Sequence, residues 1–471
     1  MGHHHHHPTA ANQAPVAVVA VPLPAQGHLN QMLHFSSLIS SYGLPVYYAG
    51  SALHNRQARA RINASNDAVS QIHFHDFPTP SFLSPPPNPN SAIKFPTQLL
   101  PAVEATLSLR RPFAAFLQEM AGKFKRVVVV HDSWMSYVVQ DVAGIHNAES
   151  YELVCISAFS SISFISGFLG LPFPLPHPKE LPLFEDWMSD EANSFADLQS
   201  KTSDFRSGSI YNTSRLIEAP YLEVLEREER NKSRPIWGLG PIFPKSIPIS
   251  KSQHQCFEWL DKQDPKSVIY VSFGTTVSFP DDQIKELADG LAESRVKFLW
   301  VLRDADKGDV FDGDVRRAEL PEGFGGREGM VVREWAPQPQ ILAHPAVGGF
   351  MSHCGWNSCV ESIMAGVAIA AWPMHSDQPS NAALVADVLK TGIVVREWKD
   401  RVGVVKASTI ESAVRRLMAS EEGDRIKKTA EKLGAAVREA TEAGGVSRIE
   451  LDSFIAHVTR EIHCMPHYLS K

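Results

Sequence analysis

The chain has 471 residues, more than one hydrophobic core usually holds, so its length predicts two domains. Its content of 44% hydrophobic and 21% charged residues is typical of a globular protein in water. A net charge of −7 without a basic cluster argues against binding to nucleic acid or membrane surfaces, and no apolar run is long enough to span a membrane.

The cysteines are few, odd in number and widely spaced. This pattern favours reduced thiols in the cytoplasm over a disulfide framework, and no pair has the spacing of a zinc site. Residues 1–12 (MGHHHHHPTAAN) resemble an expression tag and are left out of the fold prediction. The cysteines are Cys155, Cys256, Cys354, Cys359 and Cys464.

Short apolar runs alternate with helical segments over residues 13–240, which predicts a doubly wound α/β domain. The proline-rich segments 78–97 and 171–185 can be neither strand nor helix, and the first is a candidate wall of a binding cleft. The predicted strands are 14–23, 44–50, 71–76, 125–131, 152–157 and 209–213, and the predicted helices are 28–42, 52–62 and one from about 134.

A Gly-, Pro- and Ser-rich segment, GLGPIFPKSIPISKS, ends this domain, and residues 241–252 are the predicted linker. A second α/β domain is predicted over 253–450, and 451–471 is expected to form a helical segment that packs back on the N-terminal domain. The predicted elements are strands 267–273, 297–303, 330–333, 348–352 and 368–372, a helix over 281–293, one near 355–363 and a helical region from about 407.

Polar motifs follow five predicted strands at the points where those strands end. The carboxyl ends of parallel strands meet at one edge of a sheet, where doubly wound domains bind their ligands. The motifs therefore predict one binding site in a cleft between the two domains. They are AQGH (25–28), HDSW (131–134), SFGTT (272–276), MSHCGWNS (351–358) and MHSDQ (374–378).

The HCGWNS turn opens a predicted helix, and the free N–H groups of a helix N-terminus attract a pyrophosphate. Side-chain donors and glycines around it would allow a close approach, although ordinary Asn/Ser helix capping explains part of the motif equally well. SFGTT offers a second turn of small residues beside the same cleft. The candidate contacts are His353, Gly355, Asn357, Ser358, Gly274 and Thr275.

Three further features suit a sugar nucleotide. Trp335 precedes a rigid Ala-Pro-Gln turn that could hold its indole flat against a base. Glu361 lies among apolar and small helix residues and could accept both hydroxyls of a ribose. Asp377 and Gln378 could bind sugar hydroxyls. The alternatives are a core tryptophan, a surface glutamate and a helix cap.

His28 and Asp132 are the candidate reacting groups. His28 opens the first long helix, whose N-terminus disfavours imidazolium and leaves the ring able to accept a proton. Asp132 ends a strand expected beside the first one and could orient the imidazole. No GxSxG serine motif is present, so His28 would deprotonate a substrate hydroxyl directly. A purely structural histidine is the alternative.

Two competing signals are weaker. Asp304-Ala305-Asp306 and Asp312-Gly313-Asp314 resemble metal-binding pairs, but the basic residues around them favour a solvated loop. The first strand leads into PLPAQGHLNQ, which has a single glycine and so lacks the GxGxxG of a dinucleotide site.

The motif series WAPQ…HCGWNS…E…WP…DQ resembles the signature box of plant family 1 UDP-sugar-dependent glycosyltransferases, and it spans 44 residues from Trp335 to Gln378. PAQGH near the start, VIYVSFGT and the GLGP linker extend the resemblance over nearly the whole chain. IHFHDF (72–77) and AWPMHSDQP (371–379) are similar to zeatin O-glucosyltransferases.

This resemblance implies an α/β fold of the GT-B type, with two Rossmann-like domains facing each other across a cleft. It implies inverting transfer of glucose from UDP-glucose without metal or other cofactor, and Gln378 at the last box position favours glucose. His28 would be the base and Asp132 its orienting acid. The other implied contacts are Trp335, Ala336 and Gln338 for uracil, Glu361 for ribose, His353, Asn357, Ser358 and Thr275 for the diphosphate, and Trp356, Asp377 and Gln378 for the sugar.

The expected acceptor is the side-chain hydroxyl of zeatin, with the cis isomer favoured, and the product is an O-β-D-glucoside. The alternatives are a flavonoid or other phenolic acceptor, or a UDP-sugar-binding protein without catalysis. Trp134, Phe159 and His375 are candidate acceptor contacts, although core packing explains the phenylalanines of 159–168 as well. We expect a cytoplasmic monomer whose partners are UDP-glucose and a small hydroxylated acceptor, without nucleic acid or membrane.

Overall fold

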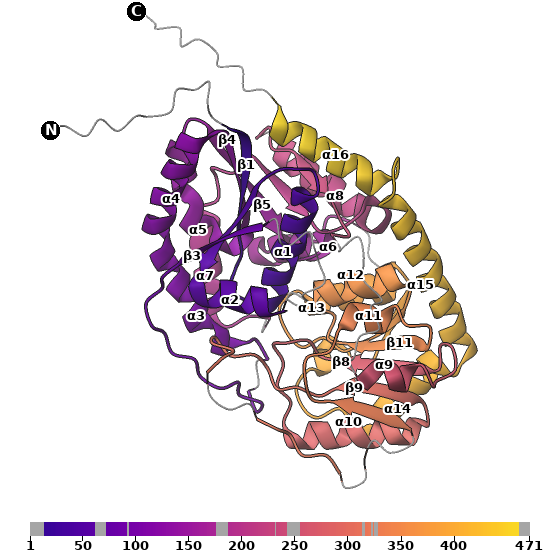
Figure 1. The fold of residues 1–471 in the computed structure, drawn as a ribbon. Helices are drawn as coiled ribbons and strands as arrows, with labels where there is room; N and C mark the ends of the chain where they lie inside the picture. Colours follow the sequence, from indigo (N-terminus) through magenta and orange to yellow (C-terminus); the bar gives the residue numbers. More distant parts are fainter. Residues whose placement is uncertain are drawn as a thin grey trace, which may run out of the picture.

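Two parallel β-sheets, each covered by helices, make up the molecule (Figure 1). The computed structural model describes residues 14–61, 72–91, 94–175, 187–230, 232–242, 255–312, 316–321, 324 and 328–460. Most of the predicted linker, the second proline-rich loop from 176 and the chain beyond 460 lie outside these residues.

The first sheet has the order β3-β2-β1-β4-β5-β6-β7 and all of its pairs are parallel. Its strands are β1 (Ala14–Val21), β2 (Val46–Ser51), β3 (Ile72–Phe77), β4 (Phe124–Asp132), β5 (Ala148–Val154), β6 (Gly208–Tyr211) and β7 (Ile236–Gly238). The helices in this part are α1 (Gln26–Ser40), α2 (Ala52–Arg61), α3 (Leu100–Ala105), α4 (Arg110–Lys123), α5 (Ser136–Val139), α6 (Ala158–Leu169), α7 (Asp190–Lys201) and α8 (Arg215–Arg230).

The second sheet, also parallel throughout, has the order β10-β9-β8-β11-β12-β13. Its strands are β8 (Val268–Ser272), β9 (Lys297–Val301), β10 (Gly329–Val332), β11 (Val347–Ser352), β12 (Ala368–Ala371) and β13 (Gly392–Val394). The helices are α9 (Gln255–Leu260), α10 (Asp281–Ser294), α11 (Gln338–Leu342), α12 (Trp356–Ala365), α13 (Gln378–Ala383), α14 (Ala407–Met418) and α15 (Glu421–Ala440).

The central strands β1 and β4 are apolar on both faces because helices cover both faces of the sheet. Val18 and Val128 pack into one core cluster, whereas their neighbours Val19 and Val129 pack into the cluster on the opposite face. The two strands pair in register up to Val21 opposite His131, so the predicted adjacency of these strands is confirmed.

Both sheets reverse their strand order at the same place. The first sheet does so between β1 and β4, and the second between β8 and β11. Ligands of open α/β sheets bind outside such a switch point. The loops after β1, β4, β8 and β11 carry AQGH, HDSW, SFGTT and HCGWNS, so the fold brings four of the five motifs to switch points.

The C-terminal helix α16 (Val446–Thr459) lies against the first sheet and not the second, as its place beside α8 shows in Figure 1. Leu451, Phe454 and Val458 are buried in the core on one face of that sheet. The helix begins before residue 451, where the C-terminal segment was expected to start. None of the helices that the structure describes is long and apolar enough to cross a membrane.

Three strand predictions differ from the structure. β7 and β13 were not predicted, because three-residue edge strands are too short to show periodicity. β5 was predicted at 152–157 but spans Ala148–Val154. The prediction followed the apolar run, whereas the first half of the real strand contains the polar residues Glu149 and Ser150. Consequently Cys155 and Ser157 lie beyond the strand, at the edge of the sheet that faces the cleft.

Candidate active site

A cavity of about 1010 Å³ lies between the two sheets, and residues after strands of both line it. Most of the predicted site residues line this cavity. Those that do so are His28, Trp134, Gly274, Thr275, Trp335, Ala336, Gln338, His353, Gly355, Trp356, Asn357, Ser358, Glu361, His375 and Asp377. Asp132, Phe159 and Gln378 are buried behind its walls.

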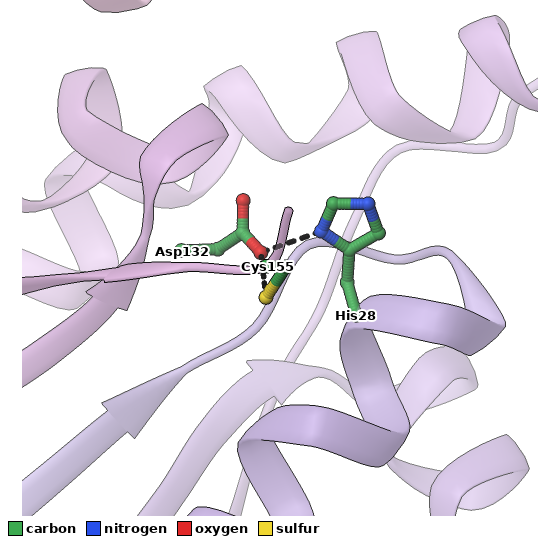
Figure 2. A group of neighbouring side chains, drawn as sticks. All are labelled: His28, Asp132 and Cys155. Atoms are coloured by element: carbon green, nitrogen blue, oxygen red, sulfur yellow. Dashed lines mark hydrogen bonds and ion pairs between the residues drawn. The ribbon is translucent and has the colours of Figure 1, made fainter. Parts of the chain in front are cut away.

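His28 and Asp132 form a hydrogen-bonded pair at the N-terminal wall (Figure 2). Nδ1 of His28 lies 2.6 Å from Oδ2 of Asp132, and the other ring nitrogen points away from the carboxylate. The imidazole side chain is 31% exposed, whereas Asp132 is 1% exposed. Since the carboxylate fixes Nδ1 as the protonated nitrogen, Nε2 is left as the acceptor.

Each group of this pair stabilises the charged form of the other. Burial lowers the pKa of His28, but the Asp132 carboxylate outweighs burial, and the net pKa is raised above its ordinary value. Burial alone would raise the pKa of Asp132, but His28 and the Trp134 N–H lower it, so this carboxyl stays ionised. At a pH above this raised pKa the imidazole is neutral, and it is more basic than that of an ordinary histidine.

Cys155 is a third member of this group that the sequence did not reveal. Its thiol lies 3.2 Å from Oδ2 of Asp132, the oxygen that His28 also contacts (Figure 2). Burial and the neighbouring Asp132 raise the pKa of Cys155 well above its ordinary value, so it stays a thiol and a donor. Within the described part of the chain, these residues form the only group of three or more side chains whose metal-ligand atoms all lie within 4.8 Å of one another, and hydrogen bonds already join them.

The predicted base-binding end of the opposite wall is built around α11 and α12. Trp335 is 39% exposed at the cavity surface, as a stacking platform must be. Nε2 of Gln338 donates to Glu361 Oε2 at 2.7 Å and to Ser358 Oγ at 3.0 Å. Burial raises the pKa of Glu361 to about 7, and the bond from Gln338 opposes that rise.

The turns after β8 and β11 meet around His353. A Cβ on Gly274 would lie 2.6 Å from Nε2 of His353, and a Cβ on Gly355 would lie 2.5 Å from the same atom. A side chain at either position would therefore push against the buried imidazole, and Gly274 also has φ +74°, which favours glycine. Burial lowers the pKa of His353 to about 4, which leaves a neutral ring beside the N-terminus of α12.

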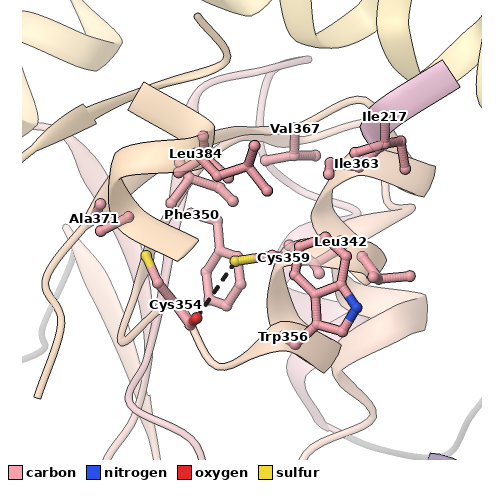
Figure 3. Packing of buried hydrophobic residues seen from close by; sticks show 14 of the residues in the cluster. Ile217, Leu342, Phe350, Cys354, Trp356, Cys359, Ile363, Val367, Ala371 and Leu384 are labelled. Atoms are coloured by element: carbon pink, nitrogen blue, oxygen red, sulfur yellow. Dashed lines mark hydrogen bonds between the residues drawn. The ribbon is translucent and has the colours of Figure 1, made fainter. Parts of the chain in front are cut away.

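Two predicted ligand residues make contacts across the domains. The indole N–H of Trp356 donates to the Asn212 carbonyl at 2.9 Å, and the ring is packed among Ile217, Leu342 and Ile363 (Figure 3). Nδ2 of Asn357 donates to the Gly27 carbonyl at 2.8 Å, next to His28.

Of the two residues predicted to bind the sugar at the start of α13, Asp377 lines the cavity but Gln378 does not. Oε1 of Gln378 accepts the N–H groups of Met374 and His375 at 2.9 and 3.1 Å, which fixes the loop before α13. Burial raises the pKa of Asp377 to about 6. Asp377 and His28 also influence each other's pKa, as expected for groups on opposite sides of one cleft.

His375 is 4% exposed and lies where the two walls meet. Its Nε2 is 3.0 Å from Thr276 Oγ, and its ring meets the edge of Phe95 at a centroid distance of 6.0 Å. Burial, and secondarily the nearby His353, lowers its pKa to about 3, so it is neutral.

The N-terminal wall beyond His28 is mainly apolar. Phe95 at the end of the proline-rich loop, Trp134 and Phe164 line the cavity, which agrees with the prediction for that loop. Phe159 does not line it: its ring packs against Phe173 and Tyr221 in the core, the alternative noted for this phenylalanine-rich stretch.

The Asp-x-Asp loop is partly buried and not simply solvated. Asp306 is 8% exposed and pairs with Arg303 at 2.9 Å, and its N–H donates to the Thr275 carbonyl. Asp304 accepts a hydrogen bond from Ser278. These contacts support the turn after β8, and Asp314 lies outside the described residues.

Comparison with known proteins identifies the family to which the chain belongs. The model for "Glycosyltransferase, N-terminal domain" matches residues 14–244, and that for "UDP-glucoronosyl and UDP-glucosyl transferase" matches residues 248–422. The zeatin O-xylosyltransferase of Phaseolus vulgaris is 49% identical, over 95% of this chain and 99% of that protein. The chain belongs to the plant family 1 UDP-dependent glycosyltransferases. It is also 48% identical to the zeatin O-glucosyltransferase of Phaseolus lunatus, over 95% of this chain and 98% of that protein.

Among solved structures, Phytolacca americana UGT2 complexed with UDP-2-fluoro-glucose and pterostilbene matches with a TM-score of 0.73. The two are 25% identical, and the match covers 94% of this chain and 99% of the other. The predicted GT-B fold is therefore confirmed, and the chain is a UDP-sugar-dependent glycosyltransferase close to the zeatin O-glycosyltransferases.

Proposed function

We propose that this enzyme transfers glucose from UDP-glucose to the side-chain hydroxyl of zeatin and releases UDP. The observation that carries the proposal is the His28–Asp132 pair, held at 2.6 Å and open to the same cavity as the nucleotide-binding turns. The zeatin O-xylosyltransferase and zeatin O-glucosyltransferase, similar over nearly the whole chain, support zeatin as the acceptor.

The reaction follows from this arrangement. Nε2 of His28 takes the proton of the acceptor hydroxyl while the oxygen forms a bond to C1 of glucose. The bond from C1 to the diphosphate breaks, and its electron pair remains on UDP. Because the oxygen attacks from the face opposite UDP, the α-linked donor gives a β-glucoside.

The pair matters more for zeatin than for a phenol. An aliphatic alcohol is much less acidic than a phenol, so its deprotonation depends more on a basic imidazole. Asp132 provides that basicity by raising the pKa of His28. The apolar wall of Phe95, Trp134 and Phe164 suits the flat purine and the isoprenoid chain of zeatin.

The roles proposed for the donor site follow the order of groups along the cavity. Trp335, with Ala336 and Gln338, binds uracil, and Glu361 binds the ribose. Thr275, His353, Ser358 and the turns of Gly274 and Gly355 bind the diphosphate. Asp377 and the backbone of Trp356 bind the sugar, whereas Asn357 and Gln378 support the site through Gly27 and the 374–378 loop. No metal or other cofactor has a part in this reaction.

A competition assay tests donor and acceptor together. Purified enzyme receives UDP-glucose or UDP-xylose with cis-zeatin, trans-zeatin and a flavonol, and the products are separated and identified. We expect zeatin O-β-glucoside as the main product, with glucose used faster than xylose and the cis isomer faster than the trans.

Three outcomes would contradict parts of the proposal. Faster use of UDP-xylose would make the enzyme a xylosyltransferase, and preferred glucosylation of the flavonol would favour a phenolic acceptor. Binding of UDP-glucose without turnover of any acceptor would indicate a binding protein.

A further inference from the structure

Asn381, on the first helical turn after the sugar loop, is fully buried at the junction of the two domains. It lies one turn after Asp377 on α13, so the two side chains share a helix face. Neither the signature motifs nor the proposed reaction gives it a role. Burying an amide is costly unless its polar atoms are satisfied, so its partners indicate what it does.

The amide group of Asn381 uses both of its N–H donors within its own domain. Nδ2 donates to Oδ2 of Asp377 at 2.7 Å and to the carbonyl of Cys354 at 2.9 Å. A carbonyl can only accept, so this contact fixes which end of the amide carries the nitrogen. The carboxylate of Asp377 and the turn of HCGWNS are thereby held by one side chain.

Its oxygen faces the other domain. Oδ1 of Asn381 lies 2.8 Å from the hydroxyls of Ser157 and Ser160, both of which are fully buried. Ser157 caps the N-terminus of α6, the helix that carries Phe164 into the acceptor wall. Glu218 fixes the same helix end by accepting the N–H groups of Ala158 and Phe159.

We propose that Asn381 is a positioning residue that holds the Asp377 carboxylate toward the donor sugar and links it to the acceptor-side helix α6. The inference rests on the proposed role of Asp377. It predicts two separable functions for one side chain: the nitrogen sets the affinity for the sugar, and the oxygen sets the alignment of acceptor and donor.

Binding measurements with UDP and UDP-glucose test the nitrogen's role without any acceptor. Asn381→Asp keeps the shape and the acceptor oxygen but removes the N–H donors and places a second carboxyl beside Asp377. We expect its dissociation constant for UDP-glucose to rise about tenfold more than that for UDP, as loss of a hydrogen bond to a charged group predicts. The lost bond to the Cys354 carbonyl affects both ligands alike. Asn193→Ala, at an exposed position of α7, serves as the control and should change neither constant.

The double variant Ser157→Ala/Ser160→Ala tests the oxygen's role and keeps Asn381 and Asp377 in place. We expect it to bind UDP and UDP-glucose like the wild type, but to show a higher KM for zeatin and a lower kcat. Asn381→Ala should combine both effects.

The inference is overturned if Asn381→Asp weakens UDP and UDP-glucose equally, because Asn381 then supports only the diphosphate turn. It is also overturned if the variants lose thermal stability but keep wild-type affinities and KM values. A wild-type enzyme that binds UDP-glucose but does not glucosylate zeatin would contradict the proposed function, and the ratio of UDP-glucose to UDP affinity would still decide the role of Asn381.

Discussion

The two walls of the cleft are built in different ways. The C-terminal wall comes largely from one continuous stretch, Trp335 to Asp377, in which successive turns follow neighbouring strands. The N-terminal wall is assembled from separate places, including His28 after β1, Phe95 at the end of a loop and Phe164 on α6. The proposed donor side is therefore one local unit of the sequence, whereas the proposed acceptor side depends on how distant segments pack together.

The largest effect is expected from removing the proposed base, His28, from the N-terminal wall. We expect His28→Ala to lower kcat by roughly 10²- to 10⁴-fold, the usual contribution of a general base, and to leave the dissociation constant for UDP unchanged. Steady-state kinetics and calorimetry measure the two quantities. His146→Ala, an exposed histidine before β5, is the matched control. Wild-type turnover in His28→Ala would remove the base from the N-terminal wall.

Removing the stacking platform tests the opposite wall. Loss of base stacking costs about 1–3 kcal/mol, so Trp335→Ala should raise the dissociation constant for UDP by roughly 5- to 150-fold. kcat at saturating UDP-glucose should change little, and Trp335→Phe should restore most of the affinity. If kcat fell instead while the affinity stayed the same, Trp335 would not act as a platform for uracil.

A smaller and pH-dependent effect is expected at Glu361. With a pKa of about 7, its carboxylate accepts ribose hydroxyls above that pH and becomes protonated below it. UDP affinity should therefore fall as the pH drops from 8 to 6. Compared with the wild type at the same pH, Glu361→Gln should bind UDP about tenfold more weakly at pH 8 and nearly as tightly at pH 6. The pH-dependent ionisation of UDP is common to both proteins, so an identical pH dependence would exclude Glu361 from ribose binding.

Much of the fold could be predicted from the sequence, because apolar runs, glycines and prolines are local signals. The adjacency of β1 and β4, and with it the meeting of His28 and Asp132, followed from the alternation of strands and helices. The three-residue strands β7 and β13 carry no such pattern.

The side-chain contacts that depend on distant partners could not be predicted. Trp356 was expected at the sugar, but its indole N–H is bonded to Asn212, which is 144 positions away. Cys155 contacts Asp132 only because β5 pairs with β4. For Asn381 a local signal did exist, since it lies four residues after Asp377 on one helix face, but its partners Ser157 and Ser160 are on the other domain.

We propose that Asp132 makes His28 the base, and the pH dependence of kcat/KM for zeatin in the wild type and in Asp132→Asn measures this dependence. The raised pKa of His28 places the wild-type loss of activity on acidification at a pH above 6.5, since imidazolium cannot accept the proton. Without the carboxylate, burial lowers the pKa and only the smaller influence of Asp377 opposes it. The variant should therefore be much slower, with its loss of activity shifted to a lower pH than in the wild type, whereas Asp190→Asn on the exposed face of α7 should match the wild type. An unchanged pH profile in Asp132→Asn would contradict the claim.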